Sequence, residues 1–454
     1  MVSALNKLKA QLKSRYGDNS VMTVNEIPDK GVVSSGSLCF DYMLGTFGIP
    51  RNIVVELAGA PGVSKSTMCL GIINNVLKLE FERAKMYARC EKATKDGKLT
   101  QEDFEWFKNR YDAQYGELHS FGRNTDNVIV NEEEQWKNDL LDNYELDDKD
   151  MKHVMNDLMR NALYLDMEGR FDRRWASRFI DKIFLDNDKV LVTRNDTLEQ
   201  ATDVYTDALR TGMFAIAILD SVGGAPTQRI VNKSAESGNI GGNALAMTRF
   251  SQFAENMASK WTCLTIGINQ IRADLAGYNR LVTPGGMAWQ HACSLRIELR
   301  RKARDVVMAL EPGTTESWYE CGFLVTARIA KSSIGRKGQA CSFWFYTSDT
   351  DKYGPAGFDR VQEIVNLAVL CGQIRKESAG RYFSDYFPNG KIHGYDKMLL
   401  FIRQNQDVFD KLYNDMKDRL NKGGIDGAIE TFEEDGSVGM ANLEVNTETG
   451  EIER

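Results

Sequence analysis

The hydrophobic and polar positions of this chain form short, mainly apolar runs separated by longer stretches with helical spacing. The runs are rich in β-branched residues, as is typical of buried strands. They lie at residues 53–58, 162–166, 190–193, 214–220 and 263–269. Helical patterns lie between them, and the first runs from about Ser66 to Leu79. Strands that alternate with helices predict an α/β fold with a mainly parallel central sheet.

Three regions depart from this rhythm. Residues 3–15 have the spacing of an amphipathic, charged helix, and a short extended stretch at 20–24 follows. Residues 81–161 are long, helical and charged, which predicts a solvated helical insertion. From about Gln339 the strand signals give way to a mixed region, 357–422, that predicts a small separate domain.

Part of the insertion, ATKDGKLTQEDFEWF, is similar to the loop of a calcium-binding EF-hand. Counting back from Gly97 puts Lys92 at the first ligand position and Thr94 at the third, although the first ligand should be a carboxylate. We therefore favour a turn at Gly97, followed by a helix that Thr100 caps with Asp103 three residues later.

Composition narrows the class of protein. The chain has 454 residues, of which 42% are hydrophobic and 27% charged, and this excludes wholesale disorder. At roughly 100–200 residues per domain, two to three folded units are expected. No apolar run approaches the roughly 20 residues that span a bilayer, which argues against an integral membrane protein. The N-terminus has no apolar signal-peptide core, so we expect an intracellular, cytoplasmic protein.

The cysteines argue against a metal or disulfide framework. The eight cysteines are scattered singly, with neither a CxxC motif nor a Cys/His cluster. Their spacing therefore indicates neither a zinc site nor disulfides.

The charge is concentrated at the C-terminus. Lys and Arg number 57 against 64 Asp and Glu, so the formal charge is −7. Residues 423–454 hold nine of the acids and one base, which leaves the remaining chain close to neutral. This acidic segment predicts a disordered tail. It is either a solubilising tail or a mobile polyanion that competes with nucleic acid for basic surface.

A phosphate-binding loop follows the first strand. It matches the pattern G-x-x-x-x-G-K-[ST] except at one position, Ser64, where the pattern has glycine. Backbone N–H groups and the start of the following helix can bind phosphates there, Lys65 can reach the β- and γ-phosphates, and Ser66 can ligate Mg²⁺. A side chain at position 64 narrows the allowed backbone geometry. The alternative is an ordinary glycine-rich turn between a strand and a helix.

Acidic residues end two further strands. Asp220 ends FAIAILD, where a carboxylate can hold the Mg²⁺ shell, and a nearby cation would offset the cost of burying it. Asp166 ends the strand at 162–166, and Glu168 follows it two residues later. Glu168 is a candidate for orienting or deprotonating the attacking water, the alternative being an exposed loop carboxylate.

With these elements in order, the sequence resembles the RecA recombinase family, including its phage-encoded relatives. The resemblance covers nearly the whole chain except the insertion, at about 81–158, and the tail. It is carried by KAQLKSRYGDNSVM, VSSGSLCFDYMLGTFGIPRNIVVELAG, LDMEGRFDRRWASRF, AIAILDSVGGAPT, TIGINQIR, TPGGMAWQHACSLRIELRR and FDRVQEIVNLAVLCGQIRKESAGRYF.

The resemblance implies an ATP site with Mg²⁺. Glu168 would activate water, Gln270 would read the γ-phosphate, and Lys65 would act on the phosphates. Trp175 would stack on adenine, the alternative being a packed helix face. The implied nucleotide contacts are Gly59, Pro61, Gly62, Ser64, Lys65, Ser66, Thr67, Asp172, Trp175 and Asp220, with Ser66 and Asp220 at the metal.

The resemblance also implies two DNA-binding loops, at about 236–243 and 272–286. Both are glycine-rich, as mobile loops should be. Arginines there could contact phosphates, and Leu275 or Tyr278 could wedge between or stack on bases. The implied DNA contacts are Gly238, Asn239, Gly241, Gly242, Arg272, Leu275, Tyr278, Arg280, Gly285 and Gly286.

In the family, two lysines of a neighbouring subunit reach the ATP phosphates. The first position falls on Lys331, which would be a catalytic residue. The second falls on Ser333, for which Arg336 or Lys337 could substitute. Together with Ser64, this departure puts the hydrolysis rate in question more than the fold.

We therefore expect an ATP-dependent strand-exchange recombinase that forms filaments on single-stranded DNA and pairs it with homologous duplex. The expected parts are an oligomerisation segment at 1–33, an ATPase core at 34–348, a small α+β domain at 349–422 that gathers duplex DNA, and the acidic tail. The partners would be single- and double-stranded DNA, further copies of the chain, and replication or repair proteins of a phage or its host. The insertion and Ser64 favour a phage source by analogy.

Three alternatives stay open at this point. A RecA-fold ring motor or helicase needs the same site but a closed hexamer. A non-catalytic, ATP-regulated DNA-binding scaffold would explain Ser64 and Ser333, although Glu168, Asp220 and Gln270 argue against it. A small-molecule kinase would need a substrate lid, which the second half of the chain does not provide.

Overall fold

The computed structural model describes residues 4–16, 21, 31–105, 141, 144–224, 226–228, 242–273, 281–311, 313–335, 337–377 and 380–433. The predicted N-terminal helix is α1 (Ala4–Tyr16). The extended stretch predicted at 20–24 lies almost wholly outside these residues, as do residues 434–454 of the tail.

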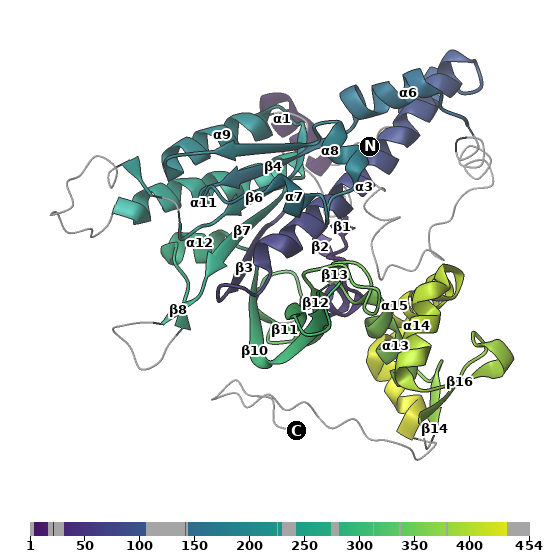
Figure 1. Ribbon diagram of the computed structural model, residues 1–454. Coiled ribbons are helices and arrows are strands. Elements are labelled where there is room, and N and C mark those ends of the chain that lie inside the picture. Colours follow the sequence, from purple (N-terminus) through teal and green to yellow (C-terminus); the bar gives the residue numbers. More distant parts are fainter. Residues whose placement is uncertain are drawn as a thin grey trace.

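A nine-stranded sheet forms the centre of the molecule (Figure 1). Its order is β13-β12-β11-β10-β3-β7-β6-β4-β5, and the five pairings from β10 to β5 are parallel. The predicted strands are β3 (Val54–Gly59), β4 (Asn161–Asp166), β5 (Val190–Arg194), β6 (Phe214–Asp220) and β7 (Leu264–Gln270). The mainly parallel α/β fold predicted from the sequence is confirmed.

Helices cover both faces of this sheet, which is why its inner strands are mostly apolar. Along β6, Ile216 and Ile218 pack with residues of α3 (Lys65–Lys95) in one core. Ala217 and Leu219 point to the other core, with residues of three further helices. These are α9 (Leu198–Arg210), α11 (Gly242–Trp261) and α12 (Gly286–Ala292). The alternation follows from the two-residue period of a strand.

Short elements connect these layers. A two-stranded sheet pairs β1 (Val32–Val33) with β2 (Ile49–Pro50), and a second pairs β8 (Arg272–Ala273) with β9 (Leu281–Val282). The short helices are α2 (Leu38–Met43), α7 (Arg173–Ala176) and α8 (Lys182–Asp186).

The helix α3 is much longer than its sequence pattern predicted. The expected end was near Leu79, but α3 continues to Lys95 and projects from the sheet in Figure 1. Helix α6 (Asp148–His153) and the π-helix η4 (Val154–Leu158) pack back against it. Lys92 donates to Asp150 at 2.6 Å across this pair. The first helix of the core therefore also forms part of the insertion.

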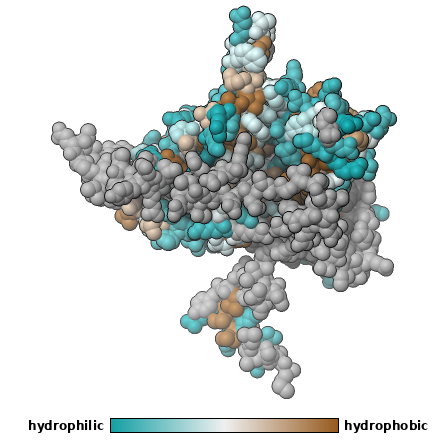
Figure 2. Space-filling view, turned by 90° about the horizontal axis from the view of Figure 1, so that it is seen from below, coloured by the Kyte–Doolittle hydropathy of each residue, from teal (hydrophilic) through white to brown (hydrophobic). Residues whose placement is uncertain are grey.

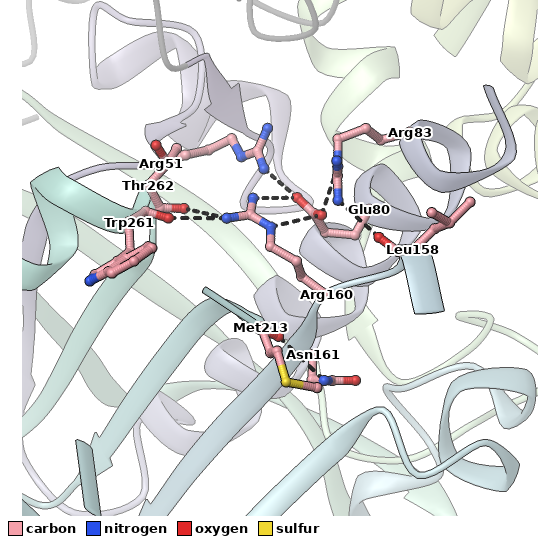
Figure 3. A network of polar contacts seen from close by, with 9 residues as sticks. All are labelled: Arg51, Glu80, Arg83, Leu158, Arg160, Asn161, Met213, Trp261 and Thr262. Atoms are coloured by element: carbon pink, nitrogen blue, oxygen red, sulfur yellow. Dashed lines mark hydrogen bonds and ion pairs between the residues drawn. The ribbon is translucent and has the colours of Figure 1, made fainter. Parts of the chain in front are cut away.

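Glu80 ties the base of this projection to the core (Figure 3). It is fully buried and contacts three arginines that come from different segments. Arg83 and Arg160 each donate to it at 2.9–3.0 Å through Nε, and Arg51 forms a further ion pair. Burial alone would raise the pKa of Glu80, but the three guanidinium groups outweigh it and hold this pKa well below its usual range.

The EF-hand alternative is not borne out by the local geometry. Gly97 has a φ of 68° and makes the predicted turn. The Thr100 hydroxyl accepts the N–H of Asp103 at 3.1 Å, and the Asp103 carboxylate accepts the N–H of Thr100 at 3.0 Å. This is the reciprocal cap expected from the spacing. No cluster of three or more His, Cys, Asp or Glu suited to a metal occurs within the described ranges.

A long antiparallel hairpin was missed by the sequence pattern. It joins β10 (Leu295–Leu310) to β11 (Trp318–Ser332), and β12 (Ala340–Tyr346) and β13 (Gly357–Phe358) extend the sheet beyond it. Much of β10 is exposed and charged, and register shifts interrupt its pairing with β11. Neither a continuous apolar run nor a clean alternation therefore marked it.

The helices and small sheet of the C-terminal region pack around a further hydrophobic core, to which Leu38 of α2 also contributes. The helices of this region are α13 (Arg360–Leu370), α14 (Tyr395–Gln404) and α15 (Gln406–Glu433). Its sheet contains β14 (Arg375–Glu377), β15 (Arg381–Phe383) and β16 (Lys391–His393), with the 3₁₀ turn η6 (Pro388–Gly390).

The helical backbone extends past Gly423, where the sequence predicts the start of the acidic tail. The backbone of α15 continues to Glu433. Ile425, Ile429 and Phe432 continue a helical spacing in this segment, and that spacing can carry a helix past two glycines despite their cost of roughly 1 kcal/mol each.

The structure also bears on the cysteines and on membrane-spanning helices. All eight cysteines are free. No described helix is long and apolar enough to cross a membrane. On the face seen in Figure 2, hydrophobic residues lie in separate patches among hydrophilic ones.

Candidate functional site

The carboxyl ends of β3, β4, β6 and β7 meet at one edge of the sheet. The register pairs Gly59 with Gln270, and Asp166 with Asp220. The motif residues that the sequence placed at strand ends therefore converge, as parallel pairing requires. Ligands of open α/β sheets bind at such an edge.

The phosphate loop connects the end of β3 to the start of α3. Residues 60–62 are exposed, so the loop is open to solvent. The Lys65 side chain is buried beneath it, and its ammonium donates to the carbonyls of Gly59 at 2.9 Å and Ala60 at 2.7 Å. Burial lowers the pKa of Lys65, and the carboxylates of Asp220 and Glu168 oppose this shift. The loop, the start of α3 and a buried cation together suit a phosphate group.

Ser64 adopts the backbone conformation that glycine would have. Its φ of 59° and ψ of 27° lie in the left-handed region, and its side chain makes no capping hydrogen bond to α3. An L-residue other than glycine costs roughly 1–2 kcal/mol there. The loop keeps its shape despite the departure from the motif, at some cost in strain.

Asp220 is held by two hydroxyl groups on one of its oxygens. Ser66 Oγ donates to Oδ2 at 2.8 Å and Tyr164 Oη at 2.5 Å. Burial raises the pKa of Asp220, and these two hydrogen bonds lower it in part. Neither bond involves Oδ1. A hydroxyl and a carboxylate in contact suit Mg²⁺, which is usually held by one or two protein oxygens, water and phosphate.

Glu168 lies between the ends of β4, β6 and β7. Ser221 Oγ donates to its Oε1 at 2.5 Å, and Gln270 Nε2 faces the same oxygen at 3.4 Å. Arg170 forms an ion pair with Oε2 at 3.0 Å and is itself largely exposed. Glu168 is therefore in direct contact with the expected sensor, and the exposed-loop alternative does not describe it.

Asp166 shapes the loop that carries Glu168. Its carboxylate accepts the N–H groups of Arg170 at 3.0 Å and Phe171 at 2.9 Å. Asp166 is buried, so its carboxylate holds this turn in place from the core side. Its role is therefore to position the loop.

The expected adenine contacts lie on α7. Asp172 accepts the N–H of Trp175 at 2.7 Å and so caps this short helix. Trp175 is partly buried against the core, donates through Nε1 to Thr67 at 3.2 Å, and has the guanidinium of Arg178 5.3 Å from its ring centre. The packed-face alternative thus holds in part, although the bond to Thr67 places the ring beside the phosphate-loop helix.

Lys331 and Ser333 lie on or next to β11. The Lys331 ammonium donates to the carbonyls of Gln290 at 2.8 Å and His291 at 2.9 Å, at the end of α12. Ser333 Oγ donates to the carbonyl of Ser294 at 3.1 Å. None of these contacts is with the phosphate loop of the same chain. Lys337 is exposed, and Arg336 lies outside the described residues.

Only part of the two expected DNA loops can be placed. Arg272 is exposed at the start of β8, and Gly285 and Gly286 precede and begin α12. Gly242 begins α11. The remaining predicted contacts lie outside the described residues: Gly238, Asn239, Gly241, Leu275, Tyr278 and Arg280.

Sequence reasoning missed three polar residues around the site. Tyr164 and Glu56 are polar positions inside otherwise apolar strands, and Ser221 directly follows Asp220. A polar side chain in a buried strand was the available signal, because such a group needs a partner. The pattern could not say which partner.

Comparison with known proteins agrees with this geometry. The family described as the RecA N-terminal domain matches residues 3–93 and 154–313, which is more than half of the chain. The chain belongs to the RecA family. It is therefore a recombinase of the strand-exchange type and a DNA-dependent ATPase. Between the two matched segments of this RecA-family protein, the unmatched residues 94–153 lie within the predicted insertion, and the match ends at residue 313.

Several bacterial relatives align along nearly the whole chain. Protein RecA of Thermus aquaticus is 22% identical over 421 residues, covering 92% of this chain and 94% of its own length. Protein RecA of Acinetobacter baumannii is 21% identical over 440 residues, covering 95% and 96%. Protein RecA of Bifidobacterium longum is 20% identical over 443 residues, covering 97% and 85%. These bacterial relatives do not bear on a phage origin, which stays a prediction.

Proposed function

We propose that this RecA-family protein hydrolyses ATP at the edge of its central sheet and uses it to assemble on single-stranded DNA. The observation that carries the proposal is the convergence of Lys65, Asp220, Glu168 and Gln270 at the ends of adjoining strands. Trp175 and Asp172 supply the proposed adenine contacts.

Ser66 and Asp220 are the residues that would hold Mg²⁺, and the phosphate loop with Lys65 would hold the ATP phosphates. When bound, the ion neutralises charge on the phosphates. The chain's own contribution is to orient groups. Ser221 and Gln270 hold the Glu168 carboxylate, which is the proposed acceptor for the proton of the attacking water.

Self-assembly is supported by an open edge of the sheet. Among the described residues, β5 pairs only with β4, so its other side is available to a further strand. Leu191 on β5 is 47% exposed. A second copy of the chain that adds a strand there would form hydrogen bonds with the unpaired backbone N–H and C=O groups of β5 and would cover this leucine. Lys331 of a neighbouring copy is then the proposed contact to ATP.

DNA is the proposed partner of the loops near 236–243 and 272–286, with Arg272 and the glycines beside α11 and α12 at the phosphates. The C-terminal domain would gather duplex DNA, and the acidic tail would compete for the same basic surface. The insertion is a candidate for binding replication or repair proteins. We place the protein in the cytoplasm of a bacterial cell.

Glu168→Gln tests this function. We expect wild-type ATP hydrolysis to rise with single-stranded DNA, and the variant to lose hydrolysis by at least about 100-fold, because the amide cannot accept a proton. ATP-dependent DNA binding should persist in the variant. An active Glu168→Gln enzyme would contradict the role of Glu168, and a wild-type protein that binds DNA with ATP but never hydrolyses it would favour a scaffold.

A further inference from the structure

Glu56 is a buried carboxylate in the middle of β3, and the proposed mechanism of ATP hydrolysis gives it no role. It is fully buried, and its Oε1 accepts hydrogen bonds from Asn269 Nδ2 at 2.7 Å and Trp289 Nε1 at 3.0 Å. Its Oε2 accepts from Arg296 Nε at 2.5 Å. We call these four residues the Glu56 cluster. A buried charge is tolerated only while its partners stay in place, because removing one leaves it uncompensated.

The Glu56 cluster is hydrogen-bonded to residues 283–284, at the end of the second proposed DNA loop. Arg296 Nη2 donates to the Thr283 hydroxyl at 2.8 Å, and Asn269 Nδ2 donates to the carbonyl of Pro284 at 2.7 Å. Trp289 stands on α12, the helix that directly follows this loop. All three donors to Glu56 are therefore joined to the segment through which the loop returns to the core.

The same cluster reaches the nucleotide site. Asn269 Oδ1 accepts the N–H of Gln270 at 3.0 Å, and the Gln270 side chain faces Glu168. The Trp289 ring lies on Gly267 of the same strand, where an added Cβ would be 2.2 Å from the ring. The strand that carries the sensor is thus packed against the helix that follows the DNA loop, with no room for a side chain between them.

We propose that Glu56 is the positioning residue through which the second DNA loop and the nucleotide site are coupled. A displacement of residues 283–284 moves Arg296 or Asn269, and both are bound to the same carboxylate. Close-packed buried groups change between discrete arrangements instead of absorbing a shift gradually. The inference rests on the proposed function. Coupling is reciprocal, so ATP raises the affinity for DNA by the factor with which DNA raises the affinity for ATP.

Arg296→Lys separates this role from simple core stability. Lysine keeps a positive charge beside Glu56 but lacks the planar fork that reaches Glu56 and Thr283 together. Arg403→Lys is the matched control, because Arg403 makes a similarly buried pair with Asp359 in the C-terminal domain. The side chains of that pair are 13% and 2% exposed, against 18% and 0% for Arg296 and Glu56.

Two ratios are measured for each protein: hydrolysis with and without single-stranded DNA, and DNA affinity with and without a non-hydrolysable ATP analogue. Thermal unfolding is followed alongside. We expect Arg296→Lys to keep its DNA-free hydrolysis and to lose at least about fivefold in both ratios, the lower end of typical coupling between sites. Arg403→Lys should lose comparable stability and keep both ratios.

Trp289→Phe is the second variant, because it keeps an aromatic side chain in the core beside Gly267 and removes the Nε1 donor to Glu56 together with part of the indole ring. It should lower both ratios as well. Wild-type ratios in both Arg296→Lys and Trp289→Phe would overturn the inference and leave the cluster a structural ion pair. If the wild-type protein shows neither hydrolysis nor ATP-dependent DNA binding, the proposed function fails and the inference fails with it.

Discussion

At the scale of single residues, Ser64 shows how a motif can be kept in shape while one of its residues departs. The backbone there stays left-handed, so the loop of this chain resembles one with glycine except for its strain. Ser64→Gly should therefore stabilise the protein by about 1 kcal/mol and strengthen nucleotide binding. Urea unfolding and titration with a fluorescent nucleotide would measure the two effects.

Gly62→Ala is the matched control for stability. Gly62 has a φ of 77°, and an added Cβ there would meet nothing within 4 Å, so the change introduces backbone strain without a clash. It should destabilise the protein by roughly 1–2 kcal/mol. A Ser64→Gly protein no more stable than wild type would show that the loop carries no strain at Ser64.

At the scale of elements, the joint between α3 and the core depends on one carboxylate. Glu80→Gln removes the buried carboxylate charge that Arg51, Arg83 and Arg160 share, so we expect a loss of about 3–5 kcal/mol at neutral pH. Glu82→Gln, on the same helix, breaks only a partly exposed pair with Lys85 and should cost less than about 1 kcal/mol. Urea unfolding of both variants gives the comparison, and equal losses would contradict it.

The same carboxylate predicts a pH dependence. The pKa of Glu80 is held well below its ordinary value of 4.5 in the folded protein. The ionised Glu80 carboxylate therefore contributes its full stabilisation at any pH above 4.5. The contribution is lost progressively as the pH falls below 4.5 toward the depressed pKa. Unfolding free energies measured from pH 6 to pH 3 should therefore fall less steeply in Glu80→Gln than in the wild type. Parallel curves would show that Glu80 titrates alike in both states.

At the scale of the whole molecule, the proposed assembly uses the open edge at β5. Leu191→Lys should leave the monomer folded, since an exposed substitution usually changes stability by under about 0.5 kcal/mol, but should prevent another chain from covering the strand. Light scattering and electron microscopy with ATP and single-stranded DNA would show shorter or absent filaments. Leu400→Lys, at a leucine 42% exposed on α14, is the control and should assemble normally. If the Leu191→Lys protein forms normal filaments, the interface between copies does not lie at β5.

The sequence by itself determined the parts of this protein that depend on local pattern. Apolar runs located β3 to β7, because strands buried on both faces need continuous hydrophobic residues. The spacing from Gly59 to Ser66 located the phosphate loop, since phosphate binding needs those residue types in that order. Glu168 and Asp220 were predicted because each follows or ends such a strand, and Gln270 was predicted from the resemblance to the family.

Only the tertiary structure decided what these residues contact. The hydroxyl of Tyr164 on Asp220, and the four residues of the Glu56 cluster, join positions far apart in the chain, and no local pattern encodes such pairs. The hairpin β10–β11 and the continuation of α3 to Lys95 are set by packing against distant segments, which overrides weak local preference. Local chemistry thus predicted which groups form the candidate site, while long-range packing decided how they are held and connected.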